Sequence, residues 1–187
     1  EALVAPPDDL TPSVIVAGFG RVGRLIGSML EEQKIPYIAV DNDPDLVARE
    51  RRNSANVYFG DATQPEFLRR CGIGEARAIA VTMDSPTRVD DVTRAARAER
   101  SDLKIIARAR DERHAQALYA IGATEAVPET IEASLQLGEA ILVETGVPMG
   151  LAIAAVHERR DGFRKLLNRP NRKELLKTLR RRKEIAS

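Results

Sequence analysis

The residues best placed to carry chemistry form a glycine-spaced turn near the amino end of the chain. Its pattern is Gly-X-Gly-X-X-Gly, and its members are Gly18, Phe19, Gly20, Arg21, Val22 and Gly23. The first glycine allows a tight turn, the second lets the backbone approach a phosphate group, and the third lets a helix pack closely on a strand. We expect the amides of Gly20, Arg21 and Val22 to lie against phosphate at the helix N-terminus, with the Arg21 side chain adding positive charge. The alternative for Arg21 is a solvent-facing residue that begins the helix.

Two residues after the second expected strand are candidates for binding a sugar. Asp41 follows the apolar residues 37–40, and Asn42 comes next. In dinucleotide-binding folds an acid at this place accepts hydrogen bonds from a ribose diol, and because it repels a 2′-phosphate, NADP is disfavoured. The alternative for Asp41 is a cap for the turn that follows. A glycine pattern alone is weak evidence, but with strand, helix and acid in order it predicts nucleotide binding; the alternative is a retained scaffold with an empty pocket.

Further positions at strand ends are expected to border the ligand. Asp61 and Ala62 follow the third strand, where a carboxylate can accept a hydrogen bond from the amino group of adenine; an N-cap for the helix at residues 65–71 is an equal alternative for Asp61. Met83 follows the fourth strand and supplies an apolar wall or simple packing. Arg108 and Arg110 flank the end of the fifth strand, and either could reach the ligand or a dimer partner. Arg108 is the better candidate for the ligand because it stands at the carboxyl end of the strand.

Short apolar segments alternate with helical segments along most of the chain. Strands are expected at residues 13–17, 37–40, 56–59, 78–82, 104–108 and 126–127. Helices are expected at residues 21–33, 65–71, 87–100, 112–121 and 131–144. A further helix is expected after Asp43, with Asp43 as its N-cap and Pro44 as its first residue. This alternation predicts an α/β fold, a Rossmann-like, doubly wound parallel sheet of six strands in the order 3-2-1-4-5-6. The ligand crevice would lie between strands 1 and 4.

The helix expected at residues 131–144 carries two apolar rows where one row would cover a sheet. One row contains Ile131, Leu135 and Leu142, and the other contains Leu137, Ala140 and Ile141. Two rows indicate a crossover helix that also packs against a second subunit. The alternative is a helix packed between the sheet and residues 147–156.

Composition limits the class of protein. The chain has 187 residues, 43% hydrophobic and 30% charged, with a net charge of +1 and no Trp. These values are typical of a soluble globular domain with a short extension. The single cysteine, Cys71, excludes an intrachain disulfide and a zinc site built from cysteines. No apolar run approaches the roughly 20 residues that cross a bilayer. We expect residues 1–11 to be a linker from a preceding region.

A basic tail follows the expected domain. Residues 164–183 contain ten Lys or Arg residues and one acid, Glu174. We expect residues 146–187 to form a helical extension whose basic tail either lies on anionic lipid as a short amphipathic helix or is disordered and solvated. Specific recognition of nucleic acid is not expected, because nothing in the tail could read bases.

Residues for catalysis are scarce. The only histidines are His114 and His157, and we expect both on the surface. Cys71 ends a helix with no histidine near it in the sequence, and no cluster marks a metal site. A dehydrogenase also needs a substrate domain and a group that handles protons beside the cofactor. We therefore expect no enzyme activity, with an oxidoreductase-type NAD domain as the alternative.

Five motifs occur in an order that resembles a known family. They are residues 18–23 (GFGRVG), 41–44 (DNDP), 58–63 (YFGDAT), 106–111 (IARARD) and 128–132 (PETIE). Together they resemble the regulator-of-potassium-conductance domain, also called TrkA-N or KTN, over about residues 12–145. The version most similar is that of Kef-type potassium/proton antiporters, to which plant plastid antiporters are related. Channel-type members usually carry a second lobe, for which the about 40 residues after 145 are too few.

The resemblance implies a regulatory function. Such domains bind AMP, ATP, NAD or NADH, pair through strand and helix edges, and pass the state of the ligand to a membrane pore or carrier. This chain would then be a homodimeric sensor of AMP or NAD(H) at the cytoplasmic face of the inner membrane. It would gate potassium efflux by an antiporter domain of the same parent chain. A regulatory subunit of a potassium channel or uptake system is the other reading.

Control by glutathione is doubtful even within this resemblance. One subset of Kef-type proteins is controlled by glutathione and has an arginine in the first helix and another before the Glu-Thr that follows strand 6. The matching positions here hold Ser28 and Pro128. A peptide carboxylate would lose its charged partners at these positions, whereas nucleotide control does not need them.

Overall fold

The computed structural model describes residues 4–7, 9–53 and 55–168. Contacts divide the chain into two units, Glu1–Ala133 and Ser134–Ser187. The division falls inside a helix, Glu129–Glu144. The basic tail beyond residue 168 lies outside the described residues.

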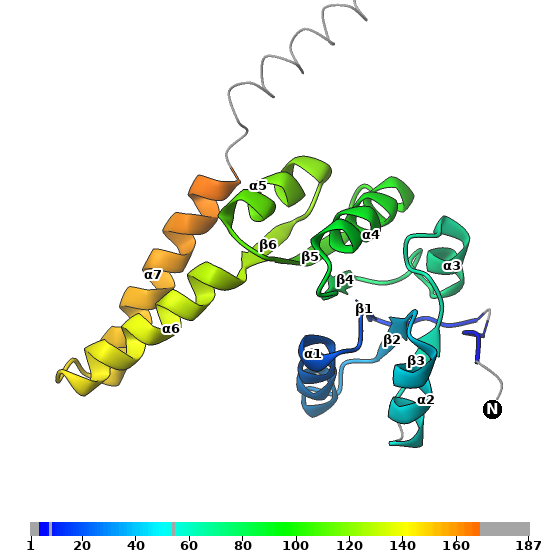
Figure 1. Cartoon of the computed structure of the whole chain (residues 1–187), viewed down its shortest axis with the longest axis horizontal. Coiled ribbons are helices and arrows are strands. Elements are labelled where there is room, and N and C mark those ends of the chain that lie inside the picture. Colours follow the sequence, from blue (N-terminus) through cyan, green and yellow to red (C-terminus); the bar gives the residue numbers. More distant parts are fainter. Residues whose placement is uncertain (1–3, 8, 54, 169–187) are drawn as a thin grey trace, which may run out of the picture. The chain divides into compact units, whose positions relative to one another are not determined.

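The first unit is built on the predicted sheet. Six parallel strands pair in the order β3-β2-β1-β4-β5-β6, which confirms the expected topology (Figure 1). The strands are β1 (Val14–Ala17), β2 (Tyr37–Asp41), β3 (Val57–Phe59), β4 (Ala78–Val81), β5 (Lys104–Ala109) and β6 (Glu125–Pro128). In β1 the register pairs Ile15 with Ile38 on one side and with Ile79 on the other. Such apolar strands are typical of a parallel sheet that is buried on both faces.

Helices follow the strands in turn. They are α1 (Arg21–Glu32), α2 (Pro44–Arg52), α3 (Pro65–Arg70), α4 (Pro86–Glu99), α5 (Glu112–Ile121), α6 (Glu129–Glu144) and α7 (Met149–Leu167). Within the first unit, α1 and α2 pack against the β1–β3 half of the sheet, and α4 and α5 pack against the β4–β6 half, on the other side (Figure 1). The expected cap of α2 is confirmed, because Asp43 accepts hydrogen bonds from the backbone of Asp45 and Leu46, with Pro44 as the first helical residue.

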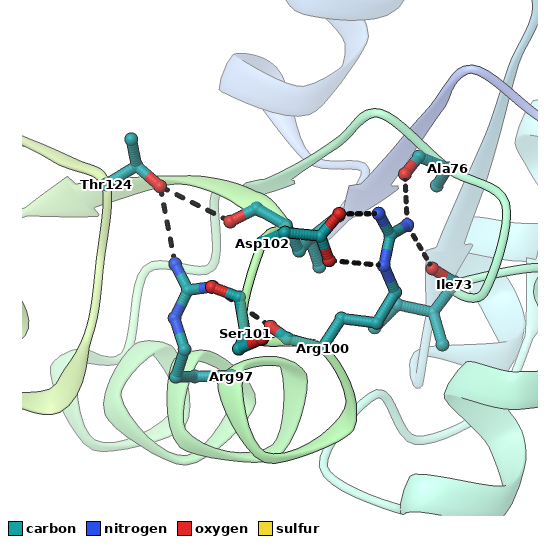
Figure 2. Close-up of polar contacts among 8 residues, drawn as sticks. Ile73, Ala76, Arg97, Arg100, Ser101, Asp102 and Thr124 are labelled. Atoms are coloured by element: carbon teal, nitrogen blue, oxygen red, sulfur yellow. Dashed lines mark hydrogen bonds and ion pairs between the residues drawn. The ribbon is translucent and has the colours of Figure 1, made fainter.

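Arginine side chains fasten the amino edge of the sheet, away from the ends that the glycine turn follows. Arg97, near the end of α4, donates from Nε to the Gly122 carbonyl at 2.9 Å. Its Nη1 reaches the Ser101 carbonyl at 2.8 Å, and its Nη2 lies 3.4 Å from the Thr124 hydroxyl (Figure 2). One guanidinium therefore joins the end of α4 to the loop that leads into β6.

A second arginine completes this fastening. Arg100 pairs with Asp102 through two hydrogen bonds of 2.9 and 3.1 Å. Its Nη1 donates to the carbonyls of Ile73 and Ala76, at 3.0 and 2.6 Å, in the loop before β4 (Figure 2). Because Arg97 and Arg100 satisfy carbonyls from several loops at once, they hold the starts of β4, β5 and β6 together.

The second unit contains a helical hairpin. After α6, Gly146 adopts a φ of 99°, its amide bonds Val143, and the Val147 amide bonds the Leu142 carbonyl at 2.9 Å. This pattern of bonds is a Schellman ending, which glycine favours because its φ is positive. The chain then turns into α7, which runs beside α6 (Figure 1). No helix among the described residues is both long and apolar enough to cross a bilayer.

The two apolar rows of α6 have different surroundings. Leu135 and Leu142 line a groove together with α7 residues that include Phe163. In contrast, Leu137 and Ile141 are 69% and 65% exposed. Residues 147–156 thus begin a helix that covers one row, while the second row lies open. Exposed apolar side chains continue onto α7 at Met149, Leu151 and Ile153.

We predict that replacing Arg97 weakens the amino edge of the sheet. Arg97→Ala leaves the carbonyls of Ser101 and Gly122 without their charged donor, and should lower the free energy of unfolding by about 2–3 kcal/mol. Urea denaturation measures this change. The matched control is Arg94→Ala on the same helix, where an exposed arginine pairs only weakly with Asp91 and the expected loss is about 0.5 kcal/mol or less. Equal losses in the two variants would contradict the assignment.

Candidate functional site

The glycine turn joins β1 to α1 at the point where the strand order of the sheet reverses. Gly18 has a φ of 99°, and its amide donates to the Val40 carbonyl at the end of β2, at 2.9 Å. A side chain on Gly23 would collide with the Gly18 carbonyl oxygen. The turn therefore needs glycine at both positions, for backbone conformation at one and for close packing at the other.

The start of α1 is open. Gly20 is the N-cap, no side chain caps the helix there, and a Cβ on this residue would meet no atom within 4 Å. Arg21 is exposed and Val22 is half-buried. The first turn of α1 carries no acidic residue. Its amide groups and the positive end of the helix dipole are thus suited to an anion.

Phe19 has a different place from its neighbours in the turn. Its ring is 3% exposed and belongs to the core cluster that includes Val16, Tyr37 and Val57. Only its backbone is therefore available at the site. That backbone amide donates to Asp41 Oδ2 at 2.8 Å.

Asp41 ties the turn to the loop after β2. While Oδ2 accepts from Phe19, Oδ1 accepts from the Asp43 amide at 2.9 Å. The cap that sequence reasoning kept as an alternative is therefore present. A carboxylate oxygen has a second acceptor position, so these bonds leave Asp41 able to accept further hydrogen bonds from a ligand.

Asp61 is held by its own turn. Its Oδ1 accepts from the Thr63 amide at 3.0 Å and from the Thr63 hydroxyl at 2.8 Å. The N-cap of α3 is Gln64, so the alternative that made Asp61 this cap is wrong; the carboxylate instead closes an Asx-type turn before the helix. Burial favours a higher pKa for Asp61, but the Thr63 hydrogen bonds and then the charge of Arg88 hold its pKa below the usual range. Ala62 is buried, so its backbone alone can border a ligand.

A missed arginine connects two of the predicted residues. Arg88, in the first turn of α4, has Nη2 at 3.5 Å from Asp61 Oδ1. With its amide oxygen facing the guanidinium, Asn42 accepts from Arg88 Nη1 and Nη2 at 2.7 and 3.1 Å. The signal in the sequence was a basic residue three places after Ser85, just inside a helix that starts at the carboxyl end of β4.

Thr82 is a second missed residue. It lies at the end of β4, is 7% exposed, and donates from its hydroxyl to the Gly18 carbonyl at 2.6 Å, with the Ala17 carbonyl at 3.2 Å. The neighbouring Met83 is half-buried, and its Cγ would lie 3.3 Å from a Cβ on Gly18. The loop after β4 is thus packed directly on the glycine turn.

Arg108 faces protein groups at the end of β5. It bonds Glu129, the first residue of α6, and donates to Asp84 at 2.6 Å and to the Thr82 carbonyl at 3.1 Å. The hydrogen bond with Glu129 raises the pKa of Arg108, with a further contribution from Asp84. The position that we expected to contact a ligand thus links β4, β5 and α6.

The residues considered for catalysis have different surroundings. The expectation that His114 lies on the surface is wrong, because its side chain is 9% exposed between Asp90, at 2.8 Å from Nε2, and the Arg110 amide, which donates to Nδ1 at 3.0 Å. His157 is exposed. Cys71 is buried, and burial raises its pKa to about 12. Within the described residues no three His, Cys, Asp or Glu side chains are arranged to hold a metal ion.

The two positions that bear on glutathione differ in exposure. Ser28 is exposed on α1 and its hydroxyl donates to the Leu25 carbonyl at 2.9 Å. Pro128 is buried at the end of β6. Neither side chain carries a charge.

Comparison with known proteins agrees with this architecture. The TrkA-N domain matches residues 14–129. The chain belongs to the TrkA-N domain family. The putative K(+) efflux antiporter KefB of Alkalimonas amylolytica is 35% identical over 171 residues, which are 90% of this chain and 26% of that protein. The K(+) efflux antiporter 2, chloroplastic, of Arabidopsis thaliana is 38% identical over 82% of this chain and 13% of its own length. This TrkA-N chain thus spans about a quarter or less of these curated relatives.

Solved structures show the same fold. The Shewanella denitrificans Kef CTD in AMP-bound form has a TM-score of 0.68 and 28% identity, and the match covers 83% of this chain and 94% of that one. The GsuK channel bound to NAD has a TM-score of 0.66 over 73% of this chain and 25% of that one; at 22% identity it supports the fold alone. The Rossmann-like fold and the resemblance to Kef-type domains are therefore confirmed.

Proposed function

We propose that this TrkA-N chain is a regulatory domain that binds an adenine nucleotide, AMP or NAD(H), and gates potassium efflux by a membrane antiporter domain of the same parent chain. The observation that carries the proposal is the open helix start at Gly20 beside a turn that Asp41 holds in place. The AMP-bound Kef CTD and the names of the antiporter relatives support it. The role is regulatory and not enzymatic, and its place is the cytoplasmic face of the inner membrane.

The ligand would bind along the carboxyl edge of the sheet. Its phosphate would lie against the amides of residues 20–22, and its ribose would donate to Asp41. Its adenine would lie beside Asp61 and the backbone of Ala62, with Met83 as an apolar wall. Because Asp41 is a carboxylate, a 2′-phosphate at the ribose would be repelled, so NADP is a poor ligand.

A chain of hydrogen bonds offers a route from this ligand to α6. The Gly18 carbonyl accepts from the Thr82 hydroxyl, and the Thr82 carbonyl accepts from Arg108, which also pairs with Glu129 at the start of α6. A ligand that forms hydrogen bonds with the glycine turn or with Arg108 would change the strength of the ion pair between Arg108 and Glu129. Since a ligand shifts an equilibrium only by its differential affinity for two states, we propose that the state of this pair is what differs.

A second copy of the chain, bound at α6, would respond to the change in this helix. The exposed apolar row of α6, Leu137 and Ile141, supports a homodimer interface, because side chains of this size are usually buried when a partner is available. Edges of the sheet would add to the same interface. The basic tail, whose part beyond residue 168 lies outside the described residues, would contact anionic lipid near the transporter.

We predict that AMP and NAD bind to the chain in isothermal calorimetry, and that NADP binds more weakly than NAD. Asp41→Ala should weaken both AMP and NAD by about 10- to 100-fold, because hydrogen bonds to a charged acceptor are lost. Asp41→Asn should lose less, since an acceptor oxygen remains. Asp45→Asn, an exposed acid in the first turn of α2, is the matched control. Unchanged affinity in a folded Asp41→Ala protein would remove Asp41 from the site.

We predict that the pair between Arg108 and Glu129 carries the effect of the ligand into α6. With AMP added to the wild-type chain, hydrogen exchange of the α6 amides should change. In Glu129→Gln this change should be lost because the ion pair is absent, while AMP still binds to the intact nucleotide site, with an affinity that differs from wild type only by the coupling that the pair carried. Glu144→Gln, an exposed residue at the other end of α6, should behave as wild type. A full exchange response in Glu129→Gln would refute this route.

We predict that the exposed row of α6 mediates dimerisation. The wild-type chain should sediment as a dimer, and the double variant Leu137→Asp with Ile141→Asp should sediment as a monomer, because two carboxylates cannot be buried without partners. Gln136→Asp adds one charge to an already exposed polar position of the same helix and should leave the dimer intact. A wild-type monomer, or a double variant that stays dimeric, would count against this interface.

A further inference from the structure

Arg88 spans the crevice in which the adenine would lie. Its guanidinium starts from α4, which follows β4, and reaches Asn42, which follows β2. In the sheet order β3-β2-β1-β4, the strand β1 lies between these two. The contact therefore crosses the carboxyl end of β1, at the switch point where nucleotides bind in open α/β sheets.

The bonds that hold Arg88 across the crevice are weak enough to break. The Asp61 carboxylate oxygen already accepts from the two Thr63 donors, at 2.8 and 3.0 Å, and Arg88 lies farther away, at 3.5 Å. The Arg88 and Asp61 side chains are 36% and 44% exposed, and exposed pairs of this kind contribute little. Asn42 is neutral and itself exposed. A ligand that enters the crevice therefore has a small cost to overcome.

A guanidinium that leaves Asn42 has an obvious new partner. It is planar and weakly hydrated, and it stacks on aromatic faces. The chain has no Trp and few other aromatic residues, and the one aromatic residue of the glycine turn, Phe19, is buried in the core. Arg88 is thus a planar side chain that already reaches over the proposed adenine position.

We propose that Arg88 is the residue that favours ligands carrying a base: it exchanges its hydrogen bonds with Asn42 for a stack on the adenine. This inference rests on the proposed nucleotide site. The closed bridge slows the entry of a base, and the stack slows its exit. A ligand without a base gains nothing from Arg88.

The rates of AMP binding test this proposal. In stopped-flow measurements, Arg88→Ala should associate with AMP faster than wild type, because no bridge has to open. It should dissociate faster by a larger factor, because the stack is lost, so that affinity for AMP falls by about tenfold. Affinity for ribose 5-phosphate, which has no base, should stay unchanged. Arg88→Lys keeps the charge without the planar group and should lose most of the preference for AMP over ribose 5-phosphate.

Controls separate this proposal from the one on which it rests. Arg94→Ala, which removes an exposed arginine from the same helix, should bind AMP with wild-type rates. If wild type binds no AMP at all, the nucleotide site itself fails. If wild type binds AMP and Arg88→Ala, shown to be folded by its thermal unfolding, has unchanged rates, the role of Arg88 is wrong. Equal weakening of AMP and ribose 5-phosphate would also overturn it, since it would indicate a contact with phosphate.

Discussion

The hydrogen bond between the Phe19 amide and the Asp41 carboxylate is the contact on which the site depends. A glycine turn has few intrinsic constraints, because glycine loses more conformational freedom on folding than other residues. Asp41 removes much of that freedom by holding the turn with one oxygen and the loop after β2 with the other. The Phe19 ring, which is buried in the core, fixes the same turn through its side chain. Together they keep the start of α1 in a position where its amides can face an anion.

Arginine side chains have different kinds of partners at the amino and the carboxyl edge of the sheet. At the amino edge, Arg97 and Arg100 bind backbone carbonyls of several loops. At the carboxyl edge, Arg88 binds the side chains of Asn42 and Asp61. Arg108 binds the side chains of Asp84 and Glu129 and also the Thr82 carbonyl. Side-chain partners that are partly exposed can be exchanged at low cost. The same residue type thus fastens one edge and leaves the other adjustable.

Sequence reasoning found what local chemistry determines. The strands and their order follow from the apolar patterns. The need for glycine at position 18 follows from backbone sterics, because its φ is positive. The Asp43 cap of α2 follows from the residue type and from the proline after it. Reasoning failed where the partner is remote in sequence. Thr82 meets the glycine turn from 64 residues away, and His114 is covered by Asp90, 24 residues before it. The local sequence around Thr82 and His114 does not predict such remote partners.

Asp61 shows the same limit at shorter range. An acid just before a predicted helix is often its N-cap, yet α3 starts three residues too late for this, at Pro65 after Gln64. The Asp61 carboxylate instead accepts hydrogen bonds from the Thr63 amide and hydroxyl, and these bonds fix the position of the carboxylate. Helix boundaries are the least certain part of any reading from sequence, so a residue whose role depends on one boundary is the first to be misassigned.

The helix α6 joins the two kinds of constraint. Its first residue, Glu129, belongs to the adjustable carboxyl edge. Farther along the helix, Leu135 and Leu142 line the groove with α7, while Leu137 and Ile141, eight and twelve residues after Glu129, are exposed. A helix is stiff over this length because each residue adds a backbone hydrogen bond. Under the proposed function, a change in the pair with Arg108 would be carried into α6 through this continuous backbone ladder. The proposed regulatory role rests on such continuity along one helix.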